Sequence, residues 1–140
     1  MTDDSKILEK ERQKVCLVDD DPGVRRSLQL LLQARGFDVR SYGAGSSLLA
    51  DSAVRGAACV VADYRMPEID GLAMLRTLRS SGWLGPAILV TAYPSAELSE
   101  QATAAGYNAI VEKPLREHAL VDMVTRLVGQ FSGDLPVHPG

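Results

Sequence analysis

Five short segments with strand character alternate along the chain with longer segments in which apolar residues recur every three or four positions. Three of the short segments, at 15–18, 59–62 and 87–90, are continuous apolar runs without the apolar–polar alternation of half-exposed strands, which is typical of strands buried on both faces of a parallel sheet. The periodic segments predict amphipathic helices. The strands are expected at 15–18, 37–41, 59–62, 87–90 and 108–111, and the helices at 22–35, 44–54, 72–80, 95–105 and 120–130.

This alternation of strand and helix predicts an α/β fold with a five-stranded parallel sheet and helices on both of its faces. Because crossover connections are right-handed, we expect a doubly wound, flavodoxin-like sheet with strand order 2-1-3-4-5. The expected domain covers residues 14–130. A polar N-terminal arm at 1–13 and a flexible tail at 131–140, rich in glycine and proline, would flank it.

Composition excludes several classes of protein. Hydrophobic residues at 46% and charged residues at 24% are ordinary for a soluble globular domain, and a net charge of −3 argues against direct contact with nucleic acid. No apolar run approaches the ~20 residues needed to span a bilayer, and the N-terminus is too polar for a signal peptide. We therefore expect a cytoplasmic protein without a membrane partner, with Cys16 and Cys59 as small core residues.

Polar residues follow the apolar strands at the points where these strands end. Asp19 and Asp20 follow the first strand, Asp63 the third, Thr91 the fourth and Lys113 the fifth. Because the carboxyl ends of parallel strands meet at one edge of a sheet, we expect these side chains to gather around the crevice between strands 1 and 3.

Three carboxylates gathered in a partly buried site repel one another unless a cation neutralises them. Without histidine or cysteine among them, the preferred cation is Mg²⁺. Beside it Asp63 can act as a nucleophile toward phosphorus, while Lys113 supplies positive charge and Thr91 a hydrogen-bond donor. Singly, Thr91 could be a strand-end hydroxyl and Lys113 a surface charge, and Asp21 is expected only to cap the helix that begins at Pro22. Jointly, they favour phosphoryl transfer.

Four short motifs stand at these strand ends, and in combination they are specific. They are Leu-Val-Asp-Asp-Asp-Pro at 17–22, Asp-Tyr-Arg-Met-Pro at 63–67 with Asp-Gly at 70–71, Leu-Val-Thr-Ala at 89–92, and Glu-Lys-Pro at 112–114. With them the chain resembles the receiver domain of two-component response regulators over about residues 14–130.

The resemblance implies roles for individual residues. Asp63 would be the phospho-acceptor, and Mg²⁺ would be held by Asp63, by Asp20 directly, by Asp19 through water and by the backbone carbonyl of Arg65. Thr91 and Lys113 would grip the phosphoryl group and report its presence, with a cis peptide bond between Lys113 and Pro114 and a small Ala92 that leaves the acyl phosphate open to attack.

The resemblance also implies partners. A histidine kinase or phosphotransfer protein would donate the phosphoryl group, and a downstream protein would bind the altered surface; a phosphorylation-dependent homodimer is also compatible with it. Such a chain is a signalling module with self-limited phosphotransfer chemistry, not a turnover enzyme.

One position departs from the family pattern. Three residues before the lysine the family usually carries an aromatic switch residue, but here that position is Ile110, and Tyr107 lies three residues away from it. Ile110 is β-branched and stiff about χ1, so it cannot swing as a ring does. We therefore expect phosphorylation to be reported through residues 92–106, a helix with a thin apolar face and its preceding loop, which would meet the partner.

Two other functions were weighed against this one. A phosphatase of the haloacid-dehalogenase type also uses an aspartate nucleophile and Mg²⁺, but it needs a second aspartate two residues later, where this chain has Arg65. A flavodoxin-like mononucleotide binder fits the strand order, but three acids at the crevice would repel a flavin phosphate.

Overall fold

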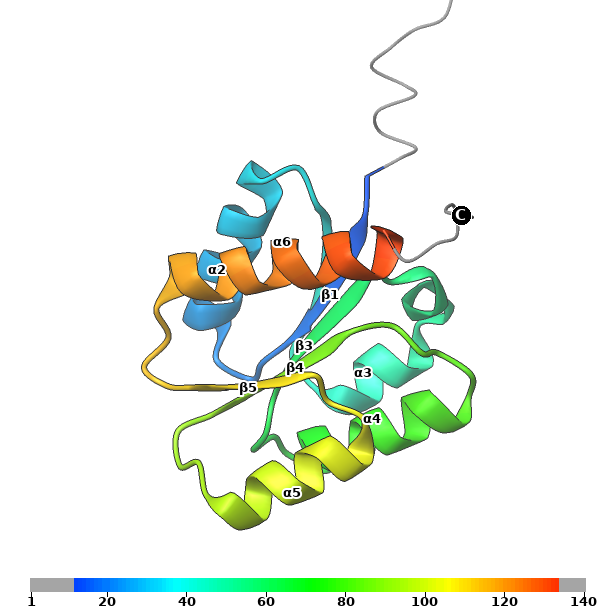
Figure 1. Cartoon of the computed structure of the whole chain (residues 1–140), viewed down its shortest axis with the longest axis vertical. Helices are drawn as coiled ribbons and strands as arrows, with labels where there is room; N and C mark the ends of the chain where they lie inside the picture. Colours follow the sequence, from blue (N-terminus) through cyan, green and yellow to red (C-terminus); the bar gives the residue numbers. More distant parts are fainter. Residues whose placement is uncertain (1–11, 134–140) are drawn as a thin grey trace, which may run out of the picture.

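A parallel five-stranded sheet organises residues 12–133, the part of the chain that the computed structural model describes (Figure 1). Its strand order is β2-β1-β3-β4-β5, which confirms the predicted topology. The strands are β1 (Lys14–Val18), β2 (Asp38–Tyr42), β3 (Cys59–Asp63), β4 (Ala87–Thr91) and β5 (Ala109–Glu112). Strands β2 and β5 begin one residue later than the sequence predicted.

Helices cover both faces of the sheet, as Figure 1 shows. Helices α2 (Pro22–Ala34) and α6 (Glu117–Gly133) lie on one face, and α3 (Gly45–Ala50), α4 (Gly71–Ser80) and α5 (Ala96–Ala105) lie on the other. Among the described residues, no helix is long and apolar enough to cross a membrane.

Two helices differ from their predicted bounds by more than one residue. The helix expected at 44–54 ends at Ala50, and a 3₁₀ helix, η1 (Ser52–Gly56), follows, because Asp51 caps the new turn by accepting from the Ala53 amide at 2.9 Å. Helix α6 runs to Gly133 and so includes residues that were expected in the tail. The N-terminal arm up to residue 11 and the tail from residue 134 lie outside the described residues.

The three central strands are buried on both faces, as their continuous apolar runs predicted. Cys16, Val60 and Leu89 pack toward α3, α4 and α5, whereas Cys59 and Ile88 pack toward α2 and α6. Both cysteines are free and fully buried, in keeping with their predicted place in the core. Burial raises the pKa of the Cys16 thiol to about 11 and that of Cys59 to about 12, so both remain protonated thiols.

Helix α2 begins where the sequence predicted, immediately after the three consecutive acids. The Asp21 side chain accepts hydrogen bonds from the amides of Gly23 at 2.9 Å and Val24 at 3.2 Å, and Pro22 occupies the first helical position. This cap turns the chain sharply at the end of β1, which leaves Asp19 and Asp20 at the edge of the sheet.

Candidate functional site

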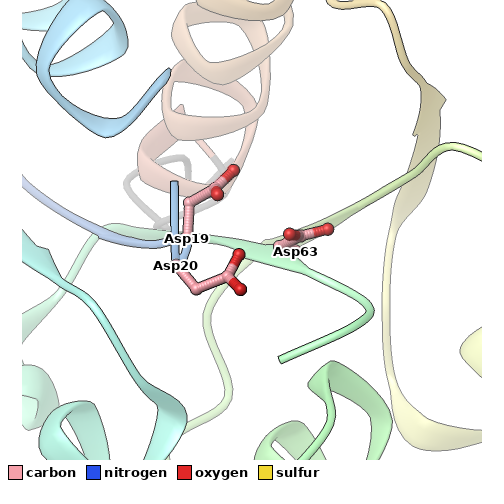
Figure 2. Close-up of side chains that lie close together, drawn as sticks. All are labelled: Asp19, Asp20 and Asp63. Atoms are coloured by element: carbon pink, nitrogen blue, oxygen red, sulfur yellow. The ribbon is translucent and has the colours of Figure 1, made fainter. Parts of the chain in front are cut away.

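The predicted acids meet at the carboxyl edge of the sheet, as Figure 2 shows for Asp19, Asp20 and Asp63. The register explains this meeting, because Val18 of β1 pairs with Ala62 of β3, and Asp19 and Asp63 are the residues that directly follow this pair, with Asp20 next to Asp19. One carboxylate oxygen from each of the three acids lies within 4.8 Å of those of the other two. Three oxygen donors this close could hold a hard cation.

The three acids differ in exposure. Asp19 is 3% exposed and Asp63 is 6% exposed, whereas Asp20 is open to solvent. Asp19 and Asp63 therefore form the buried part of the cluster, and Asp20 lies at its solvent-exposed mouth. The cluster is thus open to solvent on the side where Asp20 lies.

Lys113 reaches the same cluster from the connection between β5 and α6. Its Nζ donates to Asp63 Oδ2 at 3.2 Å and lies 3.7 Å from Asp19 Oδ2. The peptide bond between Lys113 and Pro114 is cis, as the resemblance implied. The lysine thus contacts both buried acids.

Burial and mutual repulsion shape the charges of this cluster. Burial raises the pKa of Asp63, and the nearby Asp19 raises it further, while Lys113 opposes both effects. Burial also raises the pKa of Asp19. The hydrogen bond that the Asp19 carboxylate accepts from the Asp21 amide at 2.9 Å lowers this pKa, but the effect of burial is larger. For Lys113 burial lowers the pKa, but Asp19 and Asp63 outweigh it, so the net shift is upward and the ammonium stays charged.

The raised pKa values of the two acids show that one ammonium compensates them only in part. A divalent cation among these oxygens would favour their ionised forms. The donor set, which consists of carboxylates without histidine or cysteine, fits Mg²⁺ chemistry.

Thr91 ends β4 next to Asp63, and it is only 3% exposed. Its Oγ1 accepts from the Tyr93 amide at 3.2 Å. Because this contact uses an oxygen lone pair, the hydroxyl proton can still be donated to a group bound at Asp63.

The rim of the site carries an aromatic contact that the sequence reasoning missed. The Arg65 guanidinium lies 5.9 Å from the centre of the Tyr93 ring, and Tyr93 is 75% exposed. The sequence held a signal for this contact, because Arg65 lies two residues after Asp63 and Tyr93 lies two residues after Thr91, and both Asp63 and Thr91 end strands. The role of the Arg65 backbone carbonyl as a metal ligand stays a prediction.

Ile110 lies away from the charged cluster. It pairs with Leu89 in the sheet, is half-buried, and packs against the core under α3, α4 and α5. Another contact absent from the sequence reasoning is made by Arg25 of α2, whose Nη1 donates to the backbone carbonyl of Asp19 at 2.7 Å. That contact holds the end of β1 in place.

Known proteins were compared with the chain. The family model for the response regulator receiver domain matches residues 15–125. The chain is 32% identical over 123 residues to the C4-dicarboxylate transport transcriptional regulatory protein DctR of Rhodobacter capsulatus, covering 86% of this chain and 62% of that protein. It is 31% identical over 120 residues to the transcriptional regulatory protein FixJ of Azorhizobium caulinodans, covering 86% of this chain and 57% of that protein.

Solved structures show the same fold. A CheY-like response regulator receiver domain protein from Methanospirillum hungatei superposes with a TM-score of 0.81 at 21% identity, over 89% of this chain and 99% of that one. The BeF₃-activated DrrB receiver domain superposes with a TM-score of 0.77 at 25% identity, over 84% of this chain and 97% of that one.

The chain spans less than two thirds of the length of these curated relatives, from 62% of DctR down to 24% of DctD of Rhizobium meliloti. The part that matches contains the acidic cluster, Thr91 and Lys113. The chain therefore belongs to the receiver domains of two-component response regulators.

Proposed function

We propose that this chain accepts a phosphoryl group on Asp63 in a Mg²⁺-dependent reaction and that phosphorylation changes a protein-binding surface. One observation carries the proposal: the buried Asp63 carboxylate lies 3.2 Å from the Lys113 ammonium, in a cluster where three acids lie within 4.8 Å. Phosphoryl transfer depends mainly on positioning and charge neutralisation, and this arrangement offers both.

In the proposed reaction an Asp63 carboxylate oxygen bonds to phosphorus as the bond from phosphorus to the donor breaks. Lys113 neutralises charge on the phosphoryl oxygens, and the Thr91 hydroxyl donates to one of them. Mg²⁺, when held by Asp19, Asp20, Asp63 and the Arg65 carbonyl, supplies the remaining positive charge. Ala92, which is small and exposed, leaves the acyl phosphate accessible to water, so the signal is self-limited.

The proposed donor is a histidine kinase or a phosphotransfer protein, and the proposed receiver of the signal is a downstream protein or a second copy of this chain. The relatives are named as transcriptional regulatory proteins, but the chain matches only part of each. For this chain we propose the signal-receiving role in the cytoplasm, without direct contact to nucleic acid, since its net charge is −3.

Neither alternative function is favoured. The second aspartate of a haloacid-dehalogenase phosphatase is replaced by Arg65, whose exposed side chain lies over Tyr93. For a flavodoxin-like binder, the acidic cluster would repel a flavin phosphate. We propose a signalling module that does not turn over phosphate esters.

Intact-mass spectrometry after incubation with a small acyl phosphate tests the proposal. The wild-type chain should gain one phosphate adduct when Mg²⁺ is present and none in excess chelator. Asp63→Asn should gain none under either condition. An adduct that persists in Asp63→Asn, or that forms equally well without Mg²⁺, would rule out Asp63 as the Mg²⁺-dependent acceptor.

A further inference from the structure

Tyr107 makes a buried hydrogen bond that links the start of β5 to the start of α4. Its side chain is 6% exposed, and its hydroxyl donates to the backbone carbonyl of Gly71 at 2.7 Å. Burial raises the pKa of Tyr107, so the hydroxyl keeps its proton and acts as a donor here. The two residues are 36 positions apart in the chain, so only the tertiary fold brings them together.

Gly71 lies directly against the backbone of the proposed phospho-acceptor. A Cβ atom at Gly71 would lie 2.7 Å from the Asp63 carbonyl oxygen and 3.3 Å from the Tyr64 Cα, closer than ordinary van der Waals contact in both cases. The absence of a side chain lets the first residue of α4 pack against the end of β3. A displacement of Gly71 would therefore also move the backbone of Asp63.

Gly71 also closes the loop that follows Asp63. Its amide donates to the Tyr64 carbonyl at 2.9 Å, so both ends of the 64–70 loop meet at this glycine. The loop contains Arg65, whose backbone carbonyl is a proposed ligand of Mg²⁺. The amide of Gly71 thus holds the carbonyl of Tyr64, the residue after Asp63, and the carbonyl of Gly71 is held by Tyr107.

We propose that Tyr107 is a positioning residue for the phospho-acceptor site. By holding the Gly71 carbonyl, its hydroxyl keeps the first turn of α4 against Asp63 and sets the geometry of the metal-binding loop. The inference rests on the proposed function of Asp63. It assigns a role to Tyr107, which lies three residues before Ile110.

Tyr107→Phe tests the proposal, because it removes the hydroxyl and keeps the buried ring. Titration calorimetry should show an affinity for Mg²⁺ about tenfold lower, the lower end of the range for groups that act behind metal ligands. The Mg²⁺ concentration for half-maximal phosphorylation by a small acyl phosphate should rise by the same factor. A purely structural role would lower the Tm and leave both Mg²⁺ values unchanged.

Tyr42→Phe is the matched control. It removes the same atom from a tyrosine whose hydroxyl donates to Asp51 Oδ2 at 2.9 Å, at the cap of η1 and not at Gly71, and it leaves the main chain unchanged. Its affinity for Mg²⁺ should equal that of the wild-type chain even where its Tm falls.

The outcomes separate this inference from the function on which it rests. A wild-type chain that gains no phosphate on Asp63 would refute the proposed function. Normal phosphorylation of the wild-type chain, with equal Mg²⁺ affinity in Tyr107→Phe, would overturn the role of Tyr107 alone. A Tyr107→Phe chain without a native far-UV circular dichroism spectrum would also overturn it, because the hydroxyl would then be needed for folding itself.

Discussion

At the carboxyl edge of the sheet, Asp19 and Asp63 share one ammonium and lie close to a third acid, Asp20, whereas at the amino edge polar side chains are paired with backbone groups. Arg79 of α4 donates through Nη1 to the carbonyls of Trp83 and Gly85, at 3.2 and 2.7 Å, and through Nη2 to that of Gly106 at 2.6 Å. Its guanidinium also lies 4.9 Å from the centre of the Trp83 ring.

Two further contacts complete the amino edge. The Trp83 indole N–H donates to the Ala57 carbonyl at 2.9 Å, and the Asn108 side-chain oxygen accepts from the Ala87 amide at 2.8 Å. These contacts join the segments that lead into β3, β4 and β5. Each of these contacts pairs a donor with an acceptor inside the fold.

The difference shows how one sheet combines stability with reactivity. At the amino edge, hydrogen bonds from the charged Arg79 and from neutral donors stabilise the segments that lead into the strands. At the carboxyl edge, buried carboxylates with raised pKa values are stabilised only in part, and this is where a cation and a phosphoryl group can be accommodated. Substitutions at either edge can test that division.

Asp20→Ala should lower the affinity for Mg²⁺ by at least about 100-fold, since a direct ligand contributes no less than the groups behind it. Titration calorimetry measures this. The neighbouring Asp21→Ala is the control, because Asp21 only caps α2. It should cost ~1 kcal/mol of stability in a thermal melt and leave the metal affinity unchanged. A loss of Mg²⁺ binding in Asp21→Ala would reverse these assignments.

Arg79→Met should destabilise the fold by about 2 kcal/mol, because it removes a charged donor from three carbonyls but keeps an apolar stem. Thermal unfolding followed by circular dichroism would show it. Arg76→Met, at an exposed position of the same helix, should change stability by less than ~0.5 kcal/mol. An effect of Arg79→Met no larger than that of its control would mean that the amino edge contributes little to stability.

Asp63→Asn should stabilise the metal-free fold at pH 7 by ~1 kcal/mol, or roughly 3 to 5 °C in Tm. The folded state raises the pKa of this carboxyl, so its ionisation costs stability as pH rises above the ordinary value of 3.8. The gain should therefore disappear below that pH. Glu100→Gln, at an exposed position on α5, is the control. A lower Tm for Asp63→Asn in chelator at pH 7 would contradict the electrostatic account.

Hydrogen exchange with and without beryllofluoride should show its largest change in protection within residues 92–106. Residues 92–97 at the start of this segment are all exposed, whereas its end is tied through Gly106 to Arg79, so the change should be greater at the start. Mass spectrometry of peptic fragments measures it. A response confined to α2 (Pro22–Ala34) would contradict this route of signalling.

Much of the fold could be predicted because its signals are local. Continuous apolar runs identified the buried strands, and the acids after β1 and β3 identified the functional edge, because a strand end is visible as the residue where an apolar run stops. The Asp21 cap was equally readable, since its partners lie two and three residues away. The split at Asp51 was missed because a helix and a 3₁₀ turn share a similar apolar spacing.

Contacts between distant segments could not be read in this way. Trp83 lies in the connection between α4 and β4, yet it is 6% exposed and part of the core, and its indole N–H donates to the Ala57 carbonyl 26 residues away. Tyr107, which stood out of place in the sequence pattern, reaches the carbonyl of Gly71. The residues next to Trp83 and Tyr107 in the sequence do not indicate which distant carbonyl each side chain contacts.

Which residues stand at the carboxyl edge can be read from the sequence, because strand ends follow from the apolar pattern and strand order follows from right-handed crossovers. The tertiary structure alone decided how these groups share charge: that Lys113 contacts both buried acids, and that Asp20 is left at the mouth. The physical reason is that a pKa depends on burial and on the distances between charges, which exist only once β1, β3 and the β5–α6 connection have packed together.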